Sequence, residues 1–422
     1  MKLFQQMLVA TASVGLIAPI AAQASDLINL EGMNDYKRST KSSSKRFDSN
    51  TFVNEVNEEL AGLKGRIDGL EAQQNEFEAG SFSDTTTLDG KAVFTVGSVD
   101  TEDNEYDGQT LFQYTYQMNL NSSFNGDDNL YVRLKTGNHD SWSDIKTKHN
   151  TYLSAANGNS DVLEVDKIWY TAPIGDNHTV WIGPKIENYY MHGTTPSIYK
   201  PVLKAFTLGG NAAAYGASTS PGAGWAYNAD NGFALSSNFT SSGGNTTGML
   251  TDASETSWAT QVGYTKPRYS MSAIVNVKSG GWNDEYFQTD LGEARPGDGN
   301  STNIGLRGWW RPESTGTVVP SVSVGYDTSE VDRDDDDTTS AYFLGLTWQD
   351  ILSADDRIGL AFGQPQKLEG DEVDPFLYEL YYDYKVNDSV TITPAVFGGT
   401  ANDGSDGETD MTGFAINTTF KF

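Results

Sequence analysis

The stretch Met411-Thr-Gly-Phe-Ala-Ile-Asn-Thr-Thr-Phe-Lys-Phe422 alternates between apolar and polar residues. The apolar side of an extended strand over these residues carries Phe414, Ile416, Phe420 and Phe422. The polar side carries Asn417, Thr419 and Lys421. A period of two with one apolar and one polar face suits a strand that has lipid outside and water inside. The stretch therefore predicts the closing strand of a membrane barrel.

The composition agrees with a β-rich protein. The chain has 422 residues, enough for one large barrel or for two to three ordinary domains. It has no cysteine, so an exported form must gain its stability from something other than disulfides, such as a closed hydrogen-bonded barrel. Its 43 glycines and its many aromatic residues fit frequent turns and membrane-interface positions.

Residues 1–24 have the pattern of a signal peptide. Lys2 supplies the positive start, residues 7–22 are mostly apolar, and Ala22-Gln-Ala24 is a small-x-small cleavage site. A short membrane anchor is the weaker alternative, because Pro19 and the cleavage site follow the apolar run.

Residues 25–50 and 51–80 form two further segments before the barrel. The first is a polar linker with a basic cluster, interpreted either as disordered or as an arm that contacts anionic cell-wall polymer. The second carries a heptad repeat, which predicts a self-associating coiled coil, with a helix folded on its own barrel as the alternative. Its apolar seam consists of Val53, Val56, Leu60, Leu63, Ile67, Leu70 and Phe77.

Residues 82–422 lack a helical period and show about sixteen short alternating segments. The connections between them alternate between three to eight residues and nine to thirty-eight residues. Tight turns at one end and long loops at the other are typical of outer-membrane barrels, whereas a soluble β-sandwich has no reason for this order. The predicted fold class is therefore an all-β antiparallel transmembrane barrel of about sixteen strands, preceded by a short coiled-coil helix.

Side-chain parity assigns residues to the wall of the aqueous lumen that sixteen strands would leave. The charged residues on the predicted inner face are Arg133, Lys135, Glu164, Asp166, Arg307, Glu379 and Asp383. A charge facing lipid at the midplane costs about 2–4 kcal/mol, which favours the inward assignment. Parity also predicts that Tyr131 and Trp309 face the lumen and that Trp169 faces away from Glu164 and Asp166. The charges either solvate the wall or select the solute.

The longest connection, residues 184–221, joins the fifth and sixth predicted strands. In general porins the long loop at this position folds inward and narrows the channel. By that resemblance the constriction candidates are Lys185, Glu187, Lys200 and Lys204. An ordinary surface loop is the alternative.

Five other long loops hold 25 acidic residues against three basic ones. Such a mouth concentrates cations and repels anions over a Debye length of about 8–10 Å. The loops therefore predict a cation preference, with simple solubility of exposed loops as the alternative.

The sequence shows little sign of an enzyme active site. The chain has four histidines and lacks the Gly-x-Ser-x-Gly, His-Glu-x-x-His and phosphate-binding glycine motifs. His192 stands beside Tyr189, Tyr190 and Met191, but a lone histidine is seldom a metal ligand. We expect no enzymatic activity, no cofactor, no metal site and no nucleic-acid partner.

Several stretches resemble the cyanobacterial iron-uptake porins, which belong with the carbohydrate-selective (OprB-type) porins. Residues 63–72 and 82–91 resemble the junction between their coiled coil and barrel, and residues 387–397 and 418–422 match their last two strands. The resemblance implies passive transport of small solutes, a homotrimer and a terminal assembly signal at Phe420 and Phe422. The S-layer-homology module that usually precedes the coil has no matching motif in residues 25–50.

Three functions remain open. The first is a cation-preferring diffusion porin of the outer membrane that admits inorganic iron. The second is a carbohydrate-selective porin of the same fold, in which Trp309 and Tyr131 would stack against sugar rings. The third is a structural tether, in which the periplasmic arm and coil hold the lipid-embedded barrel to the cell wall.

Overall fold

The computed structural model describes residues 85–101, 108–142, 150–210, 213–216, 219–282, 299–332, 337–370, 372–402 and 408–422. The predicted signal peptide, linker and coiled coil lie outside these residues. The described part consists almost entirely of strands: β1 (Thr86–Thr101), β2 (Leu111–Ser122), β3 (Asn129–His139), β4 (Asn157–Gly158), β5 (Glu164–Ile174), β6 (His178–Ile186), β7 (Ser220–Asn228), β8 (Phe233–Ser241), β9 (Thr256–Lys266), β10 (Tyr269–Ser279), β11 (Ser301–Trp310), β12 (Ser321–Val331), β13 (Thr338–Gln349), β14 (Arg357–Leu368), β15 (Phe376–Lys385), β16 (Val390–Asn402) and β17 (Glu408–Lys421).

Two short 3-10 helices complete the described elements. They are η2 (Asn188–Met191) and η3 (Lys204–Gly209), both in the connection between β6 and β7. Neither of these described helices has the length and the apolar character needed to cross a membrane.

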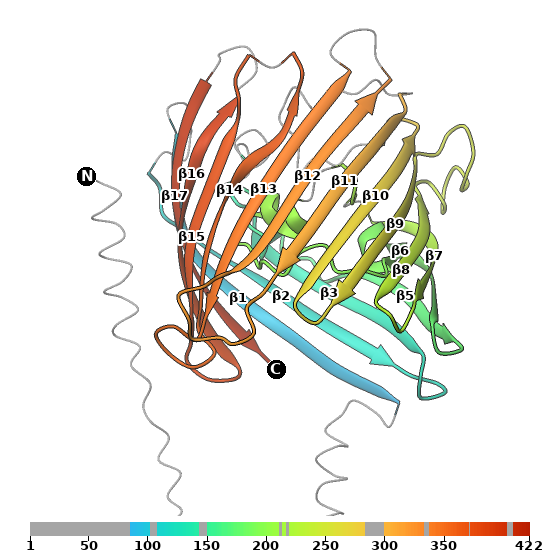
Figure 1. Ribbon diagram of the computed structural model, residues 1–422, viewed down its shortest axis with the longest axis horizontal. Helices are drawn as coiled ribbons and strands as arrows, with labels where there is room; N and C mark the ends of the chain where they lie inside the picture. Colours follow the sequence, from blue (N-terminus) through green and yellow to red (C-terminus); the bar gives the residue numbers. More distant parts are fainter. Residues whose placement is uncertain are drawn as a thin grey trace, which may run out of the picture. The chain divides into compact units, whose positions relative to one another are not determined.

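The strands form a closed antiparallel barrel. Each long strand pairs with its neighbours in the chain, and β3 pairs directly with β5, so that the two-residue β4 is a side branch. The ring closes where β17 pairs with β1, from Lys91 opposite Lys421 to Thr101 opposite Met411. Figure 1 shows the red β17 beside the blue β1 at this closure. The sixteen-stranded barrel predicted from the sequence is confirmed.

The strand faces reverse the pattern of a water-soluble protein. In β10 the exposed side chains are Tyr269, Met271, Ala273, Val275 and Val277. The buried side chains of the same strand are Ser270, Ser272, Ile274, Asn276 and Lys278. A mostly apolar surface around a largely polar interior is expected when the surrounding medium is lipid. The polar side of the C-terminal stretch also faces inward, because Thr95 on β1 donates a hydrogen bond of 2.7 Å to the Asn417 side chain on β17.

The loop lengths differ from the prediction in the second half of the barrel. The connection 332–337 has six residues, because β12 and β13 extend further into the predicted loop. The turn 311–320 has ten residues and includes Pro320. Strands can continue beyond the lipid as polar residues, so side-chain polarity does not mark where pairing ends. The strict alternation of short and long connections therefore fails there, although the strand count holds.

Gly363 and Gly308 offer a test of barrel packing. A Cβ atom on Gly363 would lie 2.2 Å from the Tyr342 carbonyl oxygen, whereas one on Gly308 would meet nothing closer than 3.4 Å. Gly363→Ala should destabilise the barrel by about 1–3 kcal/mol, because the backbone must shift to relieve the clash. Denaturant unfolding of the purified protein, followed by tryptophan fluorescence, measures the change. Gly308→Ala is the control, and equal stabilities of the two variants would contradict the packing.

Candidate functional site

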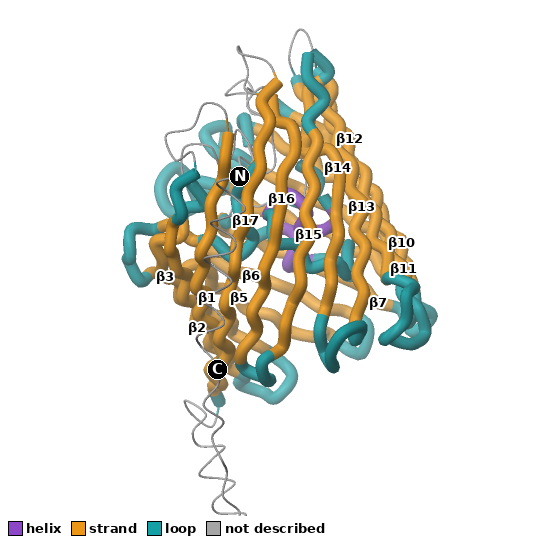
Figure 2. The backbone as a smooth tube through the Cα atoms, turned by 90° about the vertical axis from the view of Figure 1, so that its left-hand side faces the viewer, coloured by secondary structure: helices purple, strands orange, loops and turns teal. Residues whose placement is uncertain are grey.

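The connection between β6 and β7, residues 187–219, folds into the barrel and is termed the inner loop. Its helical turn η2 contacts β6 to β9, and η3 contacts β12 and β13. Figure 2 shows both turns, in purple, enclosed by the ring of strands. The inward fold implied by the resemblance to general porins is therefore confirmed, and the loop divides the lumen.

Glu379 on β15 anchors the inner loop. Its carboxylate accepts hydrogen bonds from the backbone N–H groups of Val202 (3.1 Å) and Leu203 (2.6 Å) and from the Tyr199 hydroxyl (2.9 Å). The Glu379 side chain is fully buried. Burying a carboxylate is costly unless its lone pairs are bonded, and here donors of the loop meet that need. Glu379 thus faces inward as side-chain parity predicted, but its carboxylate binds the inner loop instead of facing the open channel.

Arg307 on β11 is the second anchor. Its Nε donates to the Leu208 carbonyl oxygen at 2.7 Å, and its Nη2 lies 2.8 Å from a carboxylate oxygen of Asp327 on β12. Gly325 stands opposite Arg307, and a Cβ there would lie 1.8 Å from the Gly209 carbonyl oxygen. The loop backbone therefore touches the wall backbone. Asp327 is buried and belongs to this wall contact.

A second loop, residues 140–163 between β3 and β5, runs beside the inner loop. The Ser154 N–H donates to the Val202 carbonyl oxygen, and the Lys204 N–H donates to the Tyr152 carbonyl oxygen, both at 2.7 Å. These hydrogen bonds join the two loops into one inner layer.

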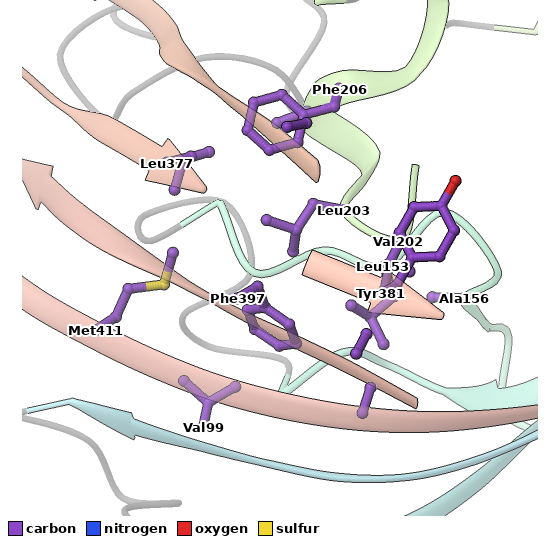
Figure 3. Packing of buried hydrophobic residues seen from close by; sticks show 14 of the residues in the cluster. Val99, Leu153, Ala156, Val202, Leu203, Phe206, Leu377, Tyr381, Phe397 and Met411 are labelled. Carbon is purple, nitrogen blue, oxygen red and sulfur yellow. The ribbon is translucent and has the colours of Figure 1, made fainter. Parts of the chain in front are cut away.

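An apolar cluster fills the space between this layer and the wall. Figure 3 shows Leu203 and Phe206 of the inner loop among Leu377, Phe397 and Met411 of the wall. All five side chains are buried. One side of the lumen is therefore closed by apolar packing, which leaves the polar residues of the other side for water and solute.

Ion pairs lie on both sides of the lumen, because Arg357 and Asp383 stand on β14 and β15, the strands that carry Ala361 and Tyr381 of the apolar cluster. The three pairs are Arg133–Asp166, Lys167–Glu187 and Arg357–Asp383. Glu187 belongs to the inner loop, so its pair with Lys167 of β5 also fixes the loop to that wall. Each of these three carboxylates is neutralised by a cation.

Four aromatic rings, with neighbours tilted by 34° to 35°, form a continuous stack beside the pairs of Arg133 and Lys167. Ring centroids are 4.3 Å apart for Tyr131 and Trp169, 4.8 Å for Trp169 and Tyr190, and 4.4 Å for Tyr190 and Tyr189. The Lys167 ammonium group lies 5.5 Å from the Tyr190 ring centroid, a cation–π contact. The stack extends from the barrel wall to the inner loop.

Trp169 corrects the parity analysis. The sequence predicted that it faces away from Asp166, but it packs inward against Tyr131. The cause is an irregularity in the pairing of β3 with β5 between Arg133 and Leu134, where β5 contains an extra residue. A bulge of one residue reverses the facing of all later residues in the strand.

Lys185 and Glu164 lie apart from the inner cluster. Lys185 is opposite Ile168, is exposed, and donates to the Val165 carbonyl oxygen at 2.8 Å. Glu164 is exposed where β5 begins and accepts a hydrogen bond of 3.3 Å from Asn159. Lys185 therefore does not join the inner-loop residues with which the resemblance to general porins grouped it, whereas Glu164 is the Cα partner of Lys135.

The two inner-loop lysines, Lys200 and Lys204, lie among charged groups of the wall. Lys200 is exposed, and the nearby positive charge of Arg357 is the main cause of its lowered pKa. Lys204 is half-buried, and its burial lowers its pKa, while Glu187 opposes this effect. Lys135 lies on the same side, within electrostatic range of Lys204.

Further inner cations were missed by the sequence analysis: Lys91, Lys167 and Arg357. Lys91 and Phe94 lie on opposite faces of β1, and Phe94 faces outward, so side-chain parity alone could have placed Lys91 on the inner face. Lys167 could not be found in this way, because the bulge precedes it. No sequence pattern indicates that Arg357 lies near Lys200, because Lys200 belongs to the inner loop and Arg357 begins the distant strand β14.

His192 is half-buried in the inner loop beside polar side chains. Its Nδ1 lies 3.3 Å from Ser236 Oγ and 3.3 Å from Asn238 Nδ2. Burial lowers its pKa to about 3, so that the ring is neutral at pH 7. Among the described residues, no group of three or more His, Cys, Asp or Glu side chains could hold a metal ion.

Removing the Glu379 anchor should widen the channel. Glu379→Leu leaves the Val202 and Leu203 N–H groups without their acceptor, at about 1–3 kcal/mol for each buried donor. We expect larger and noisier single-channel currents in planar bilayers, because the loop detaches from β15. Glu164→Leu, at the exposed start of β5, is the control. A folded Glu379→Leu barrel with wild-type conductance would contradict this anchoring role.

Comparisons with known proteins agree with this geometry. An uncharacterized protein of Nostoc sp. is 28% identical over 415 residues, which cover 87% of this chain and 71% of that protein. Pseudomonas putida OprB has the same fold with a TM-score of 0.56 at 12% identity, over 80% of this chain and 94% of that one. The trimer form of OmpT, an outer membrane protein of Vibrio cholerae, gives a TM-score of 0.51 at 14% identity, over 80% of this chain and all of that one. The sequence profile of the carbohydrate-selective porins matches residues 48–422, and the chain therefore belongs to the OprB family.

Proposed function

We propose that this outer-membrane diffusion channel passes small hydrophilic solutes, with carbohydrates as the class that its interior fits best. The observation that carries this proposal is the aromatic stack of Tyr131, Trp169, Tyr190 and Tyr189 beside Arg133 and Lys167. Sugar rings bind to aromatic faces through their C–H surfaces, while their hydroxyl groups need donors and acceptors nearby. The site combines both kinds of group on one side of the inner loop.

Cation preference and passage of iron rank second. Their support is the acidic excess of the long loops. Against them stand the ion pairs of the lumen, in which Asp166, Glu187 and Asp383 are each neutralised by a cation. A carboxylate already paired attracts a passing cation only weakly, so the narrow part of the channel gives cations little advantage.

The remaining proposals concern the orientation of the barrel, the coiled coil and the basic arm. We propose that the chain ends of the barrel face the periplasm, that the coil joins three copies, and that the basic arm contacts cell-wall polymer. The trimer form of OmpT is a precedent for a homotrimer of this fold. Light scattering on the detergent-solubilised protein should give three times the mass of the chain, and a monomeric mass would contradict the trimer.

Sugar uptake tests the proposed solute class. Proteoliposomes that contain the protein should swell in isotonic glucose or arabinose, and glucose should reduce the single-channel current. Tyr131→Leu should weaken this block by about two- to tenfold, the equivalent of one aromatic contact of about 0.5–1.5 kcal/mol. Trp258→Leu is the control, because Trp258 is exposed on the outer face of β9. Swelling without any sugar block would argue against carbohydrate recognition.

A further inference from the structure

Lysines without a carboxylate partner lie on the inner face of the barrel. None of Lys91, Lys135, Lys200 and Lys421 forms an ion pair with a residue that the structure describes. Lys200 and Lys421 are exposed, and Lys91 and Lys135 are half-buried. Together with Arg133 these residues are termed the basic ladder.

The strand register brings the ladder together. Lys91 on β1 is the direct Cα partner of Lys421 on β17. On the other side, Gln117 of β2 pairs with both Lys91 and Lys135. Neighbouring strands are about 4.8 Å apart, so Lys421, Lys91 and Lys135 lie within about 15 Å along one inner row. Like charges directly opposite each other destabilise a sheet, so this row favours an anion between its members.

The inner loop adds a cation to the same region. Lys200 is within electrostatic range of Lys421 and of Arg357, and Arg357 is the first cause of the lowered pKa of Lys200. Lys91 is likewise within range of Arg133. The positive charges therefore continue from Lys421, at the end of the barrel where the chain stops, to Arg133 in the middle of β3.

The acidic loops lie too far away to cancel this charge. Lys91 is ten residues before the end of β1 at Thr101, a distance of about 33 Å along the strand. Because barrel strands tilt by about 40° from the barrel axis, this corresponds to about 25 Å along the axis. At physiological ionic strength the Debye length is about 8 Å, so three Debye lengths separate the ladder from the loop end. Two carboxylates are closer to the row: Glu164 is the Cα partner of Lys135, and Asp89, two residues before Lys91, accepts hydrogen bonds from Asn119 and Asn121. The three lysines of the row outnumber these two carboxylates.

We infer that the basic ladder is a binding site for a small oxyanion, either free phosphate or the phosphate group of a sugar. Lysine and arginine donate several hydrogen bonds to the oxygens of such a group. The inference rests on the proposed diffusion channel and names a second solute class for it. It predicts a channel that prefers anions, in contrast to the cation preference expected from the loop composition.

Planar-bilayer recordings of the full-length protein test the ladder. In a KCl gradient the reversal potential should show a preference for chloride, and inorganic phosphate should block the chloride current at millimolar concentration. Glucose 6-phosphate should block at lower concentration than glucose if the ladder also takes sugar-bound phosphate, and free phosphate alone should block if it does not. Lys91→Gln combined with Lys200→Gln should weaken the phosphate block by about fivefold or more, because the double variant removes two of the charges that attract the anion.

Lys266→Gln is the matched control, because Lys266 is the last residue of β9 and its ammonium group lies over the Tyr264 ring. It should leave both the selectivity and the phosphate block unchanged. A conducting channel that prefers potassium, or a phosphate block equal in the double variant and the wild type, would overturn the ladder and leave the diffusion function intact. A folded protein without any conductance would instead overturn the proposed function. Resistance of the unheated protein to SDS verifies that each variant has formed its barrel.

Discussion

The pairing of β17 with β1 is the constraint on which the rest of the structure depends. In a lipid environment each backbone N–H and C=O group needs a partner inside the protein, and an open sheet edge has none. The eleven Cα partners from Lys91 opposite Lys421 to Thr101 opposite Met411 remove both edges at once. The closed ring also fixes which face of every strand is inside. It therefore determines where a charge can lie, and the anchors of the inner loop follow from it.

A closed barrel of this size leaves an interior that side chains alone do not fill, and the inner loop occupies part of it. A loop placed there carries backbone donors and acceptors away from bulk water, so it needs polar partners on the wall. Glu379 accepts from two of its N–H groups, and Arg307 donates to one of its carbonyl oxygens. Gly325 provides the space for this contact. The charged wall residues that the sequence suggested for solute selection therefore divide into loop anchors and residues open to the channel.

The sequence could predict the features that depend on local periodicity. The strand count, the closing strand and the facing of Tyr131 and Trp309 all follow from a period of two, which each strand carries within itself. Trp169 shows where this reasoning stops, because its facing depends on a bulge in the pairing of two strands. Lys185 shows the same limit, since a loop boundary and a register shift decide on which side it lies. The partnership of Glu379 with Val202 joins residues 177 positions apart, and no local pattern records it.

Charge selectivity shows why position outweighs composition. The chain has 57 acidic and 28 basic residues, and its long loops hold much of the acidic excess. A charge acts on a solute only within about one Debye length, so an acidic mouth affects entry while the narrowest part affects passage. Inside the barrel the carboxylates of Asp166, Glu187 and Asp383 are paired with cations, whereas Lys91 and Lys200 form no ion pair with a residue that the structure describes. Net charge therefore describes the mouth alone, and the charge pattern along the inner face depends on the positions of individual lysines and carboxylates.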